Sequence, residues 1–174
     1  MRVLLLLISA SLCFAADPFD GWGKVKWGAS ADQIKDAYKA EGVTDALELP
    51  KYDIGEDFYA VKFSMEADGL AFVELRPAQG DYVSTAFSQK GKDDIIRLIN
   101  LNRQSIRISH LLEEKYGPPS KNLSKISDIS EIFMEWYLDG GSIRLKFLPD
   151  AGGKNLVYKL RLRYERKNKA LDKI

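Results

Sequence analysis

The chain has 174 residues, with 26 basic and 25 acidic side chains and a formal net charge of +1 at pH 7. Hydrophobic residues make up 45% and charged residues 29%, which are ordinary values for a globular domain and exclude a largely disordered chain. The near-neutral balance provides no overall field that would attract nucleic acid, so we expect no nucleic-acid partner.

The first sixteen residues predict a secretory signal peptide. One positive charge, Arg2, precedes an apolar run over residues 3–12, and small residues follow at Cys13 and Ala15, the positions that a signal peptidase reads. The run is shorter than the ~20 apolar residues that a membrane-spanning helix needs. We therefore expect cleavage near Ala15 or Ala16, a periplasmic or secreted location, and no transmembrane segment once the signal is removed.

Cys13 is the only cysteine in the chain, and it lies inside the predicted signal peptide. Cleavage would leave a protein that forms no disulfide and offers no thiolate for catalysis or for a metal. Bacterial lipoproteins carry their lipid on a cysteine that directly follows a small residue. Leu12 fits that signal badly, so the sequence favours ordinary cleavage over a lipid anchor at Cys13.

The chain after the signal predicts a single domain over residues 17–165, followed by a polar tail over residues 166–174. The length is typical of one domain. A first helix is expected after a capping box at Ser30 and Gln33, and it ends before Gly42. Three strands are expected next, at residues 58–65, 70–75 and 82–87.

Apolar and small residues recur at spacings of three and four in the middle of the chain and predict a long helix from about Asp93 to Tyr116. The stripe consists of Leu98, Leu101, Ser105, Ile108 and Leu112. The helix ends at Gly117-Pro118-Pro119, because glycine suits the cap and proline cannot continue the helix. Three further strands are expected at residues 132–138, 142–148 and 156–164.

The order helix, three strands, helix, three strands indicates an α+β fold built from two α-β-β-β halves at residues 28–87 and 92–164. Short hairpin connections favour an antiparallel sheet with the helices packed on one of its faces. The identity between the two halves is too low to establish a repeat.

Two fragments resemble small exported bacterial proteins, most of them uncharacterised: Trp27-Gly28-Ala-Ser30-Ala-Asp-Gln33-Ile34 before the first helix, and Leu112-Glu-Glu-Lys-Tyr116-Gly117-Pro118-Pro119 at the end of the second. The order of the elements also resembles the SmpA/OmlA outer-membrane assembly lipoproteins and the β-lactamase inhibitor protein. This resemblance implies an adaptor or an inhibitor that acts by protein contact. It transfers no functional residue, because both fragments consist of helix-capping residues and a shared fold does not define a site.

Alternating cations in the last two predicted strands give the strongest indication of a binding surface. Because strand side chains alternate between faces, five cations would share one open face of the sheet. They are Arg144, Lys146, Lys159, Arg161 and Arg163. Glu135 could join them from the preceding strand, with Phe133 and Tyr137 beside it. Such a face suits an anionic ligand or an acidic protein patch, although solvated sheet faces are also commonly charged.

Charge is also segregated along the chain. Residues 45–74 carry eight acidic and two basic side chains, whereas residues 159–173 carry seven basic and two acidic ones. This segregation favours oriented contacts with a partner. Trp22 is a further candidate contact residue, because aromatic side chains dominate interface hot spots. Packing in the core is the alternative for Trp22.

The sequence contains no recognisable catalytic or metal-binding constellation. His110, the only histidine, is expected on the exposed side of the long helix, and a lone histidine cannot build a zinc site without further ligands. The acidic pairs, such as Asp93-Asp94, are adjacent in sequence rather than facing each other across a substrate. We therefore predict no catalytic residue, no metal and no cofactor, and an enzyme is not favoured.

These observations favour a non-enzymatic exported module that binds an envelope protein or an anionic ligand through the basic sheet face. One alternative is a small-molecule carrier with an apolar pocket between the sheet and the long helix, lined by Leu98, Leu101 and Phe147. A second alternative is a hydrolase of unknown specificity that uses His110 or a carboxylate pair. The sequence leaves the identity of the partner and the oligomeric state open.

Overall fold

The computed structural model describes residues 19–85, 91–125, 130–150 and 155–167. The predicted signal peptide, the end of the third predicted strand at residues 86–87 and the tail beyond Lys167 lie outside these residues. Within the described ranges, no helix is both long enough and apolar enough to cross a membrane.

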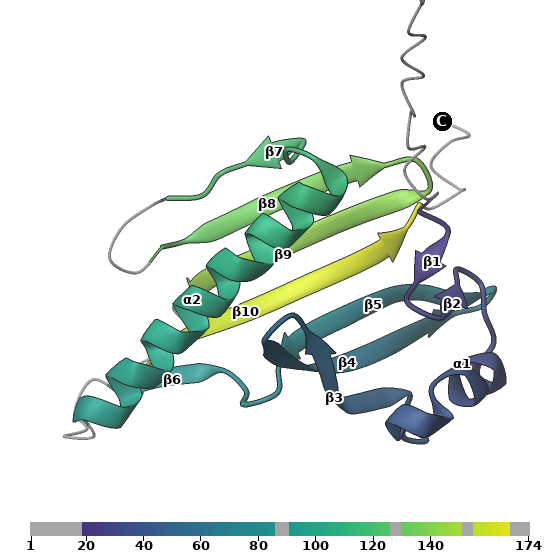
Figure 1. The fold of residues 1–174 in the computed structure, drawn as a ribbon, viewed down its shortest axis with the longest axis horizontal. Helices are drawn as coiled ribbons and strands as arrows, with labels where there is room; N and C mark the ends of the chain where they lie inside the picture. Colours follow the sequence, from purple (N-terminus) through teal and green to yellow (C-terminus); the bar gives the residue numbers. More distant parts are fainter. Residues whose placement is uncertain (1–18, 86–90, 126–129, 151–154, 168–174) are drawn as a thin grey trace, which may run out of the picture.

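A large antiparallel sheet crossed by a long helix makes up most of the described chain (Figure 1). In chain order the elements are β1 (Gly21–Trp22), β2 (Val25–Lys26), α1 (Ala31–Ala37), the 3-10 helix η1 (Lys39–Glu41), β3 (Glu48–Ile54), β4 (Asp57–Glu66), β5 (Gly69–Pro77), β6 (Tyr82–Thr85), α2 (Gly91–Tyr116), β7 (Lys121–Asn122), β8 (Ile132–Leu138), β9 (Gly141–Asp150) and β10 (Asn155–Arg166). The spatial order of the sheet is β3-β4-β5-β10-β9-β8-β7, and β6 pairs with a separate part of β10. The predicted α+β class with an antiparallel sheet is confirmed.

Each half of the chain contributes a meander of three long strands, β3-β4-β5 and β8-β9-β10. The last strands of the two meanders, β5 and β10, pair with each other and join both halves into one sheet. Sequence reasoning missed β3, because Pro50 and a register shift between Leu49 and Tyr52 interrupt its alternation. It also missed β1, β2 and β7, which have only two residues each.

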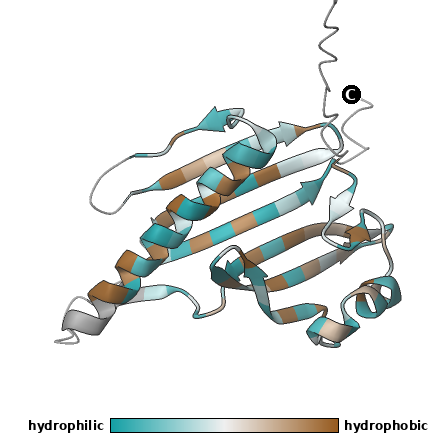
Figure 2. Cartoon of the chain, in the orientation of Figure 1, coloured by the Kyte–Doolittle hydropathy of each residue, from teal (hydrophilic) through white to brown (hydrophobic). Residues whose placement is uncertain are grey.

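One face of the sheet is apolar and forms the core, as the alternating colours along the strands in Figure 2 indicate. The strand registers align one buried row across six strands, consisting of Leu49, Val61, Leu75, Leu162, Leu145 and Met134. Helix α2 lies across this face (Figure 1). The predicted stripe of α2 packs against it, with Leu101 and Ser105 completely buried.

The first helix begins with the predicted capping box. Gln33 N–H donates to Ser30 Oγ at 3.3 Å, and Ser30 N–H donates to Gln33 Oε1 at 2.8 Å. The helix is shorter than expected, because α1 ends at Ala37 and the chain tightens into η1. Gly42 then supplies the left-handed cap, with a φ of 75°.

The two fragments that carry the family resemblance position elements of the fold. Gly28 N–H donates to the Leu70 carbonyl at 2.9 Å, which ties the segment before α1 to the start of β5. A Cβ at Gly69 would lie 2.2 Å from the Gly28 oxygen, so this close approach requires glycine. After α2, the Gly117 carbonyl accepts a hydrogen bond from the Trp136 indole at 2.9 Å. Both fragments therefore have structural roles.

Candidate functional site

The sheet face opposite α2 carries the five cations that the sequence singled out. β9 and β10 place Arg144 opposite Arg163 and Lys146 opposite Arg161. Lys159 lies further along β10, opposite Leu148. The register of these two strands thus brings all five cations together on one face.

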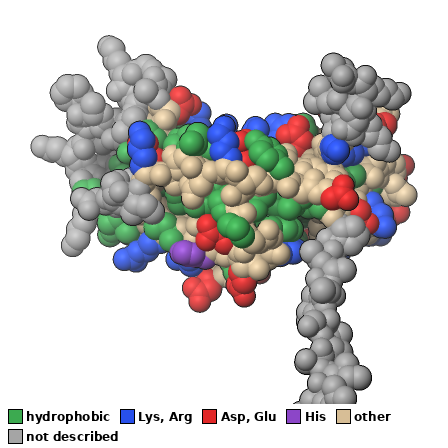
Figure 3. Space-filling view, turned by 90° about the horizontal axis from the view of Figure 1, so that it is seen from above, with side chains coloured by type: hydrophobic (Ala, Val, Ile, Leu, Met, Phe, Trp, Pro, Cys, Tyr) green, Lys and Arg blue, Asp and Glu red, His purple; other side chains and the backbone are tan. Residues whose placement is uncertain are grey.

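Acidic side chains are interleaved with these cations. One row crosses seven strands and consists of Glu48, Lys62, Glu74, Arg163, Arg144, Glu135 and Lys121. In Figure 3, which views the molecule from above, blue and red side chains are mixed along the upper rim. The face therefore carries both signs of charge, and Glu48 and Glu74 join the Glu135 that the sequence placed beside the cations. The reason is that β5, from the acidic part of the chain, pairs with the basic strand β10.

Arg161 is held in a bidentate ion pair. Its Nη1 and Nη2 atoms donate to the two carboxylate oxygens of Asp81 at 2.6 and 2.7 Å, and Glu74 Oε1 lies 3.9 Å from its Nε. The hydrogen bonds that Arg161 donates to Asp81 raise the pKa of Arg161 above its ordinary value. Both side chains are 25% exposed. Arg161 thus fastens the loop after β5 to β10.

Glu135, on β8, is a buried carboxylate on the same face of the sheet. Its carboxylate accepts hydrogen bonds from Arg144 Nε and, at 3.0 Å, from the Tyr137 hydroxyl. Lys121 Nζ lies 3.8 Å away. Burial alone would raise the pKa of Glu135, but the hydrogen bonds from Arg144 and Tyr137 outweigh it and lower the pKa.

Glu135 is expected to contribute stability that depends on pH. A carboxyl whose pKa is lowered by folding stabilises the protein fully above its unfolded pKa of about 4.3 and loses this contribution as the pH falls through the folded value. We expect Glu135→Gln to lower the free energy of unfolding by about 2 kcal/mol at pH 7 and by much less at about pH 3. Urea unfolding at both pH values measures this difference.

The control for this prediction is Glu131→Gln. Glu131 has a 37% exposed side chain and pairs with the exposed Lys125 at 3.7 Å, so its loss should change stability by less than about 1 kcal/mol at either pH. An equal loss at both pH values for Glu135→Gln would contradict the role assigned to its charge.

Two of the remaining cations are also engaged. Arg163 donates to Glu165 at 3.1 Å, and its guanidinium carbon lies 3.8 Å from the centre of the Phe72 ring. Lys159 pairs with the exposed Asp150. These ion pairs neutralise most of the positive charge that the face would otherwise present to a ligand.

Lys146 differs from the other four cations. Among the described residues it has no carboxylate partner, and its Nζ lies 5.3 Å from the centre of the Phe133 ring. Phe133 is half-buried, and Tyr137, four residues further along β8 on the same face, is 62% exposed. We refer to Lys146, Phe133 and Tyr137 as the Lys146 patch.

Trp22 lies in the core instead of on the surface. It is 8% exposed, and its ring centre lies between 5.1 and 6.3 Å from four other aromatic rings. These rings belong to Tyr38, Tyr52, Phe63 and Tyr164. The expectation that Trp22 contacts a partner is therefore corrected, because the β1–β2 hairpin directs this side chain inward.

The side chains named for the alternative functions lie elsewhere. His110 is 73% exposed, and its Nδ1 lies 4.0 Å from Glu113. Of the residues named for a carrier pocket, Leu101 and Phe147 are completely buried and Leu98 is partly buried against the core. The described ranges contain no group of three or more His, Cys, Asp or Glu side chains that could hold a metal ion.

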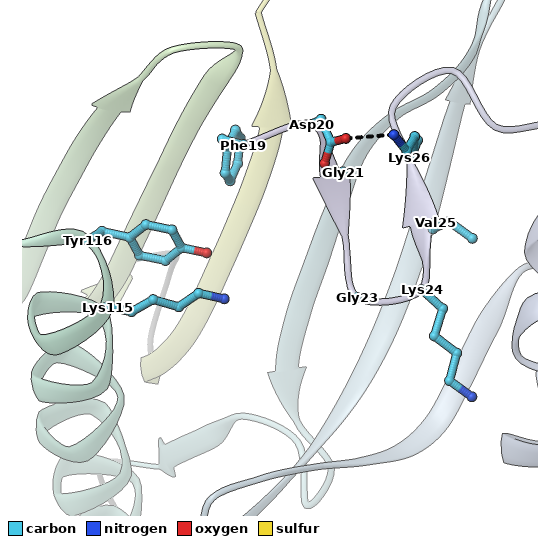
Figure 4. A pocket seen from close by; sticks show the side chains of 9 residues that line it. All are labelled: Phe19, Asp20, Gly21, Gly23, Lys24, Val25, Lys26, Lys115 and Tyr116. Carbon is cyan, nitrogen blue, oxygen red and sulfur yellow. Dashed lines mark ion pairs between the residues drawn. The ribbon is translucent and has the colours of Figure 1, made fainter. Parts of the chain in front are cut away.

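The described surface includes two hollows within the size range of small-ligand sites. One, of about 440 Å³, lies between the β1–β2 hairpin and the last turn of α2, where Lys115 and Tyr116 point toward the hairpin (Figure 4). The two lysines of that hairpin are already paired with carboxylates. The other hollow, of about 470 Å³, lies on the open face beside β3, β4 and β5. Sequence reasoning identified neither, because each depends on the register or packing of distant segments.

Comparison with known proteins gives a weak structural similarity. No family model matches the chain, and no curated protein matches it. Among solved structures, the chain is similar to YjgB, a DUF4309 family protein from Bacillus subtilis subsp. subtilis str. 168, at 12% sequence identity and a TM-score of 0.33. The match covers 80% of this chain and 79% of that chain.

Proposed function

We propose that the protein is an exported binding module that contacts a protein partner through the Lys146 patch. The observation that carries this proposal is that Lys146 keeps no carboxylate partner among the described residues, whereas the other four cations of its face have one. The exposed Tyr137, which lies on the same face beyond the Glu135–Arg144 pair, supplies the kind of side chain that dominates interfaces. Export itself remains a prediction from the composition of the first sixteen residues.

The mixed charge of the face favours a protein over a polyanion or an anionic lipid surface. Such ligands gain affinity from several cations that are free to pair with them. Here Glu135, Asp81 and Glu165 already neutralise three of the arginines. A protein surface can instead offer one carboxylate to Lys146 and apolar area to the Phe133 and Tyr137 rings of the same face. The resemblance to envelope assembly proteins and to an inhibitor protein supports the same class of function.

Photo-crosslinking in cells that export the protein tests this proposal. A p-benzoyl-L-phenylalanine at position 137 is expected to give a discrete crosslinked product with a second polypeptide. The same residue at position 110, on the exposed side of α2, is the control and is expected to give none. Products at both positions, or at neither, would contradict the proposal.

A second measurement separates the two classes of partner. We expect the purified protein to stay in the supernatant when it is sedimented with phosphatidylglycerol vesicles, because carboxylates already neutralise most cations of the face. Binding to these vesicles without a crosslink to protein would replace the protein partner with an anionic lipid surface.

A further inference from the structure

The hollow on the open face results from small residues on three adjacent segments. Ala60 of β4 lies opposite Arg76 of β5, so only a methyl group flanks the arginine on that side. Next to β4, the strand β3 shifts register around Pro50. The loop at residues 78–81 forms the remaining wall. Together these segments leave a hollow of about 470 Å³.

Arg76 lines this hollow without an ion-pair partner among the described residues, and it is exposed. The two acidic residues of the lining are engaged elsewhere. Glu48 lies 3.7 Å from Lys62 Nζ, and Asp81 accepts the two hydrogen bonds of Arg161. The charge of Arg76 is therefore available to a ligand.

The rest of the lining is largely small and apolar. It includes Pro50, Ala60, Pro77 and Ala78. A concave apolar lining with a small number of placed polar groups is typical of ligand sites. Because β3 is the edge strand of the sheet, no further strand of the described chain blocks the approach from that side.

We propose that this hollow binds a carboxylate carried by a peptide segment, with Arg76 as its counterion. A guanidinium pairs with a carboxylate through two parallel hydrogen bonds, which fixes the orientation of the ligand. The alanine and proline walls accept a small apolar group next to the carboxylate. The carboxylate comes either from the C-terminus of the peptide or from an acidic side chain. This site goes beyond the proposed function, because it shares no residue with the Lys146 patch.

Nuclear magnetic resonance of the ¹⁵N-labelled protein tests the proposal with three blocked peptides. The first is acetyl-Gly-Ala-Ala with a free C-terminal carboxylate, the second is the same peptide amidated, and the third is amidated acetyl-Ala-Glu-Ala. The free carboxylate is expected to shift amide signals within residues 44–50 and 76–81 and at residue 60. Amidation should weaken binding about tenfold or more, since it removes a charge-assisted contact. The response to the third peptide shows whether an acidic side chain serves as well.

Matched variants assign the effect to Arg76. Arg76→Gln is expected to abolish the shifts without changing the melting temperature, since this arginine is exposed and unpaired among the described residues. Arg103→Gln is the control, because Arg103 is also exposed and has no ion pair within the described part of the chain, but lies on α2. Ala60→Leu fills the hollow and should also abolish the shifts.

Two results would overturn the proposal. One is that neither the free carboxylate nor the glutamate peptide shifts signals around the hollow. The other is that Arg76→Gln binds both peptides as the unsubstituted protein does. Neither result would affect the crosslink at position 137, so this failure is distinguishable from failure of the proposed function.

Discussion

Trp22→Ala is expected to lower the free energy of unfolding by about 3–5 kcal/mol, the range typical of large-to-small changes at buried aromatic residues. The Trp22 ring contacts Tyr38 after α1, Phe63 on β4 and Tyr164 on β10, so it joins the β1–β2 hairpin to both halves of the sheet. Its removal leaves a cavity that these rings cannot fill. Thermal unfolding followed by circular dichroism should show a melting temperature roughly 10 °C lower.

Tyr137→Ala is the control for this prediction, because Tyr137 is 62% exposed. It should lower the free energy of unfolding far less than Trp22→Ala does, because it removes one hydrogen bond to Glu135 and no core packing. If Trp22→Ala were as stable as Tyr137→Ala, Trp22 would not be a core residue, and a role in contacting a partner would be favoured instead.

Arg161→Glu is expected to lower the free energy of unfolding by about 3 kcal/mol. The substitution removes the bidentate pair with Asp81 and places a third carboxylate next to Asp81 and Glu74. Loss of one partner of a buried ion pair costs about 3–5 kcal/mol. Both side chains of this pair are 25% exposed, so we expect a cost at the lower end of that range. Urea unfolding of the purified variant measures the loss.

Lys159→Glu provides a matched charge reversal on the same strand and the same face. Lys159 and its partner Asp150 are 41% and 53% exposed, and exposed ion pairs contribute about 1 kcal/mol or less. We therefore expect a small change in stability for this variant. Equal losses in the two variants would show that Arg161 does not fasten the loop to β10.

Local patterns were enough to predict most elements of the fold. The capping box at Ser30 and the glycine after α2 mark helix ends through short-range hydrogen bonds, and the alternation in β9 and β10 marks strands. The sequence did not predict β3, because Pro50 and the register shift interrupt the alternation of apolar and polar side chains in this strand. It becomes a strand through pairing with β4, a contact that the local sequence of β3 does not encode.

The same limit explains the candidate site. A period of two places the five cations on one face, but their ionic partners come from other strands and loops. Asp81 is 80 residues away from Arg161 in the chain, and the two meet only because β5 pairs with β10. The segregation of acidic and basic stretches along the chain is thus balanced largely within the fold. Sequence alone could not distinguish this arrangement from a basic face that awaits a partner.

The hollow beside Arg76 depends on register in the same way. Ala60 gives no signal in the sequence, and its importance lies in its position opposite Arg76. A shift of β4 by two residues would place Lys62 or Phe58 there and fill the space. Such a site becomes visible only when the pairing of the strands is known.

The most direct test of the Lys146 patch is the yield of the crosslink at position 137 in the Lys146→Glu variant, compared with Lys159→Glu. Both variants reverse one lysine on the same sheet face, but only Lys146 lies next to the Phe133 ring and lacks a carboxylate partner among the described residues. We predict that Lys146→Glu abolishes the crosslink and that Lys159→Glu leaves its yield unchanged. An undiminished crosslink in the Lys146→Glu variant would contradict the assignment of this patch as the contact surface.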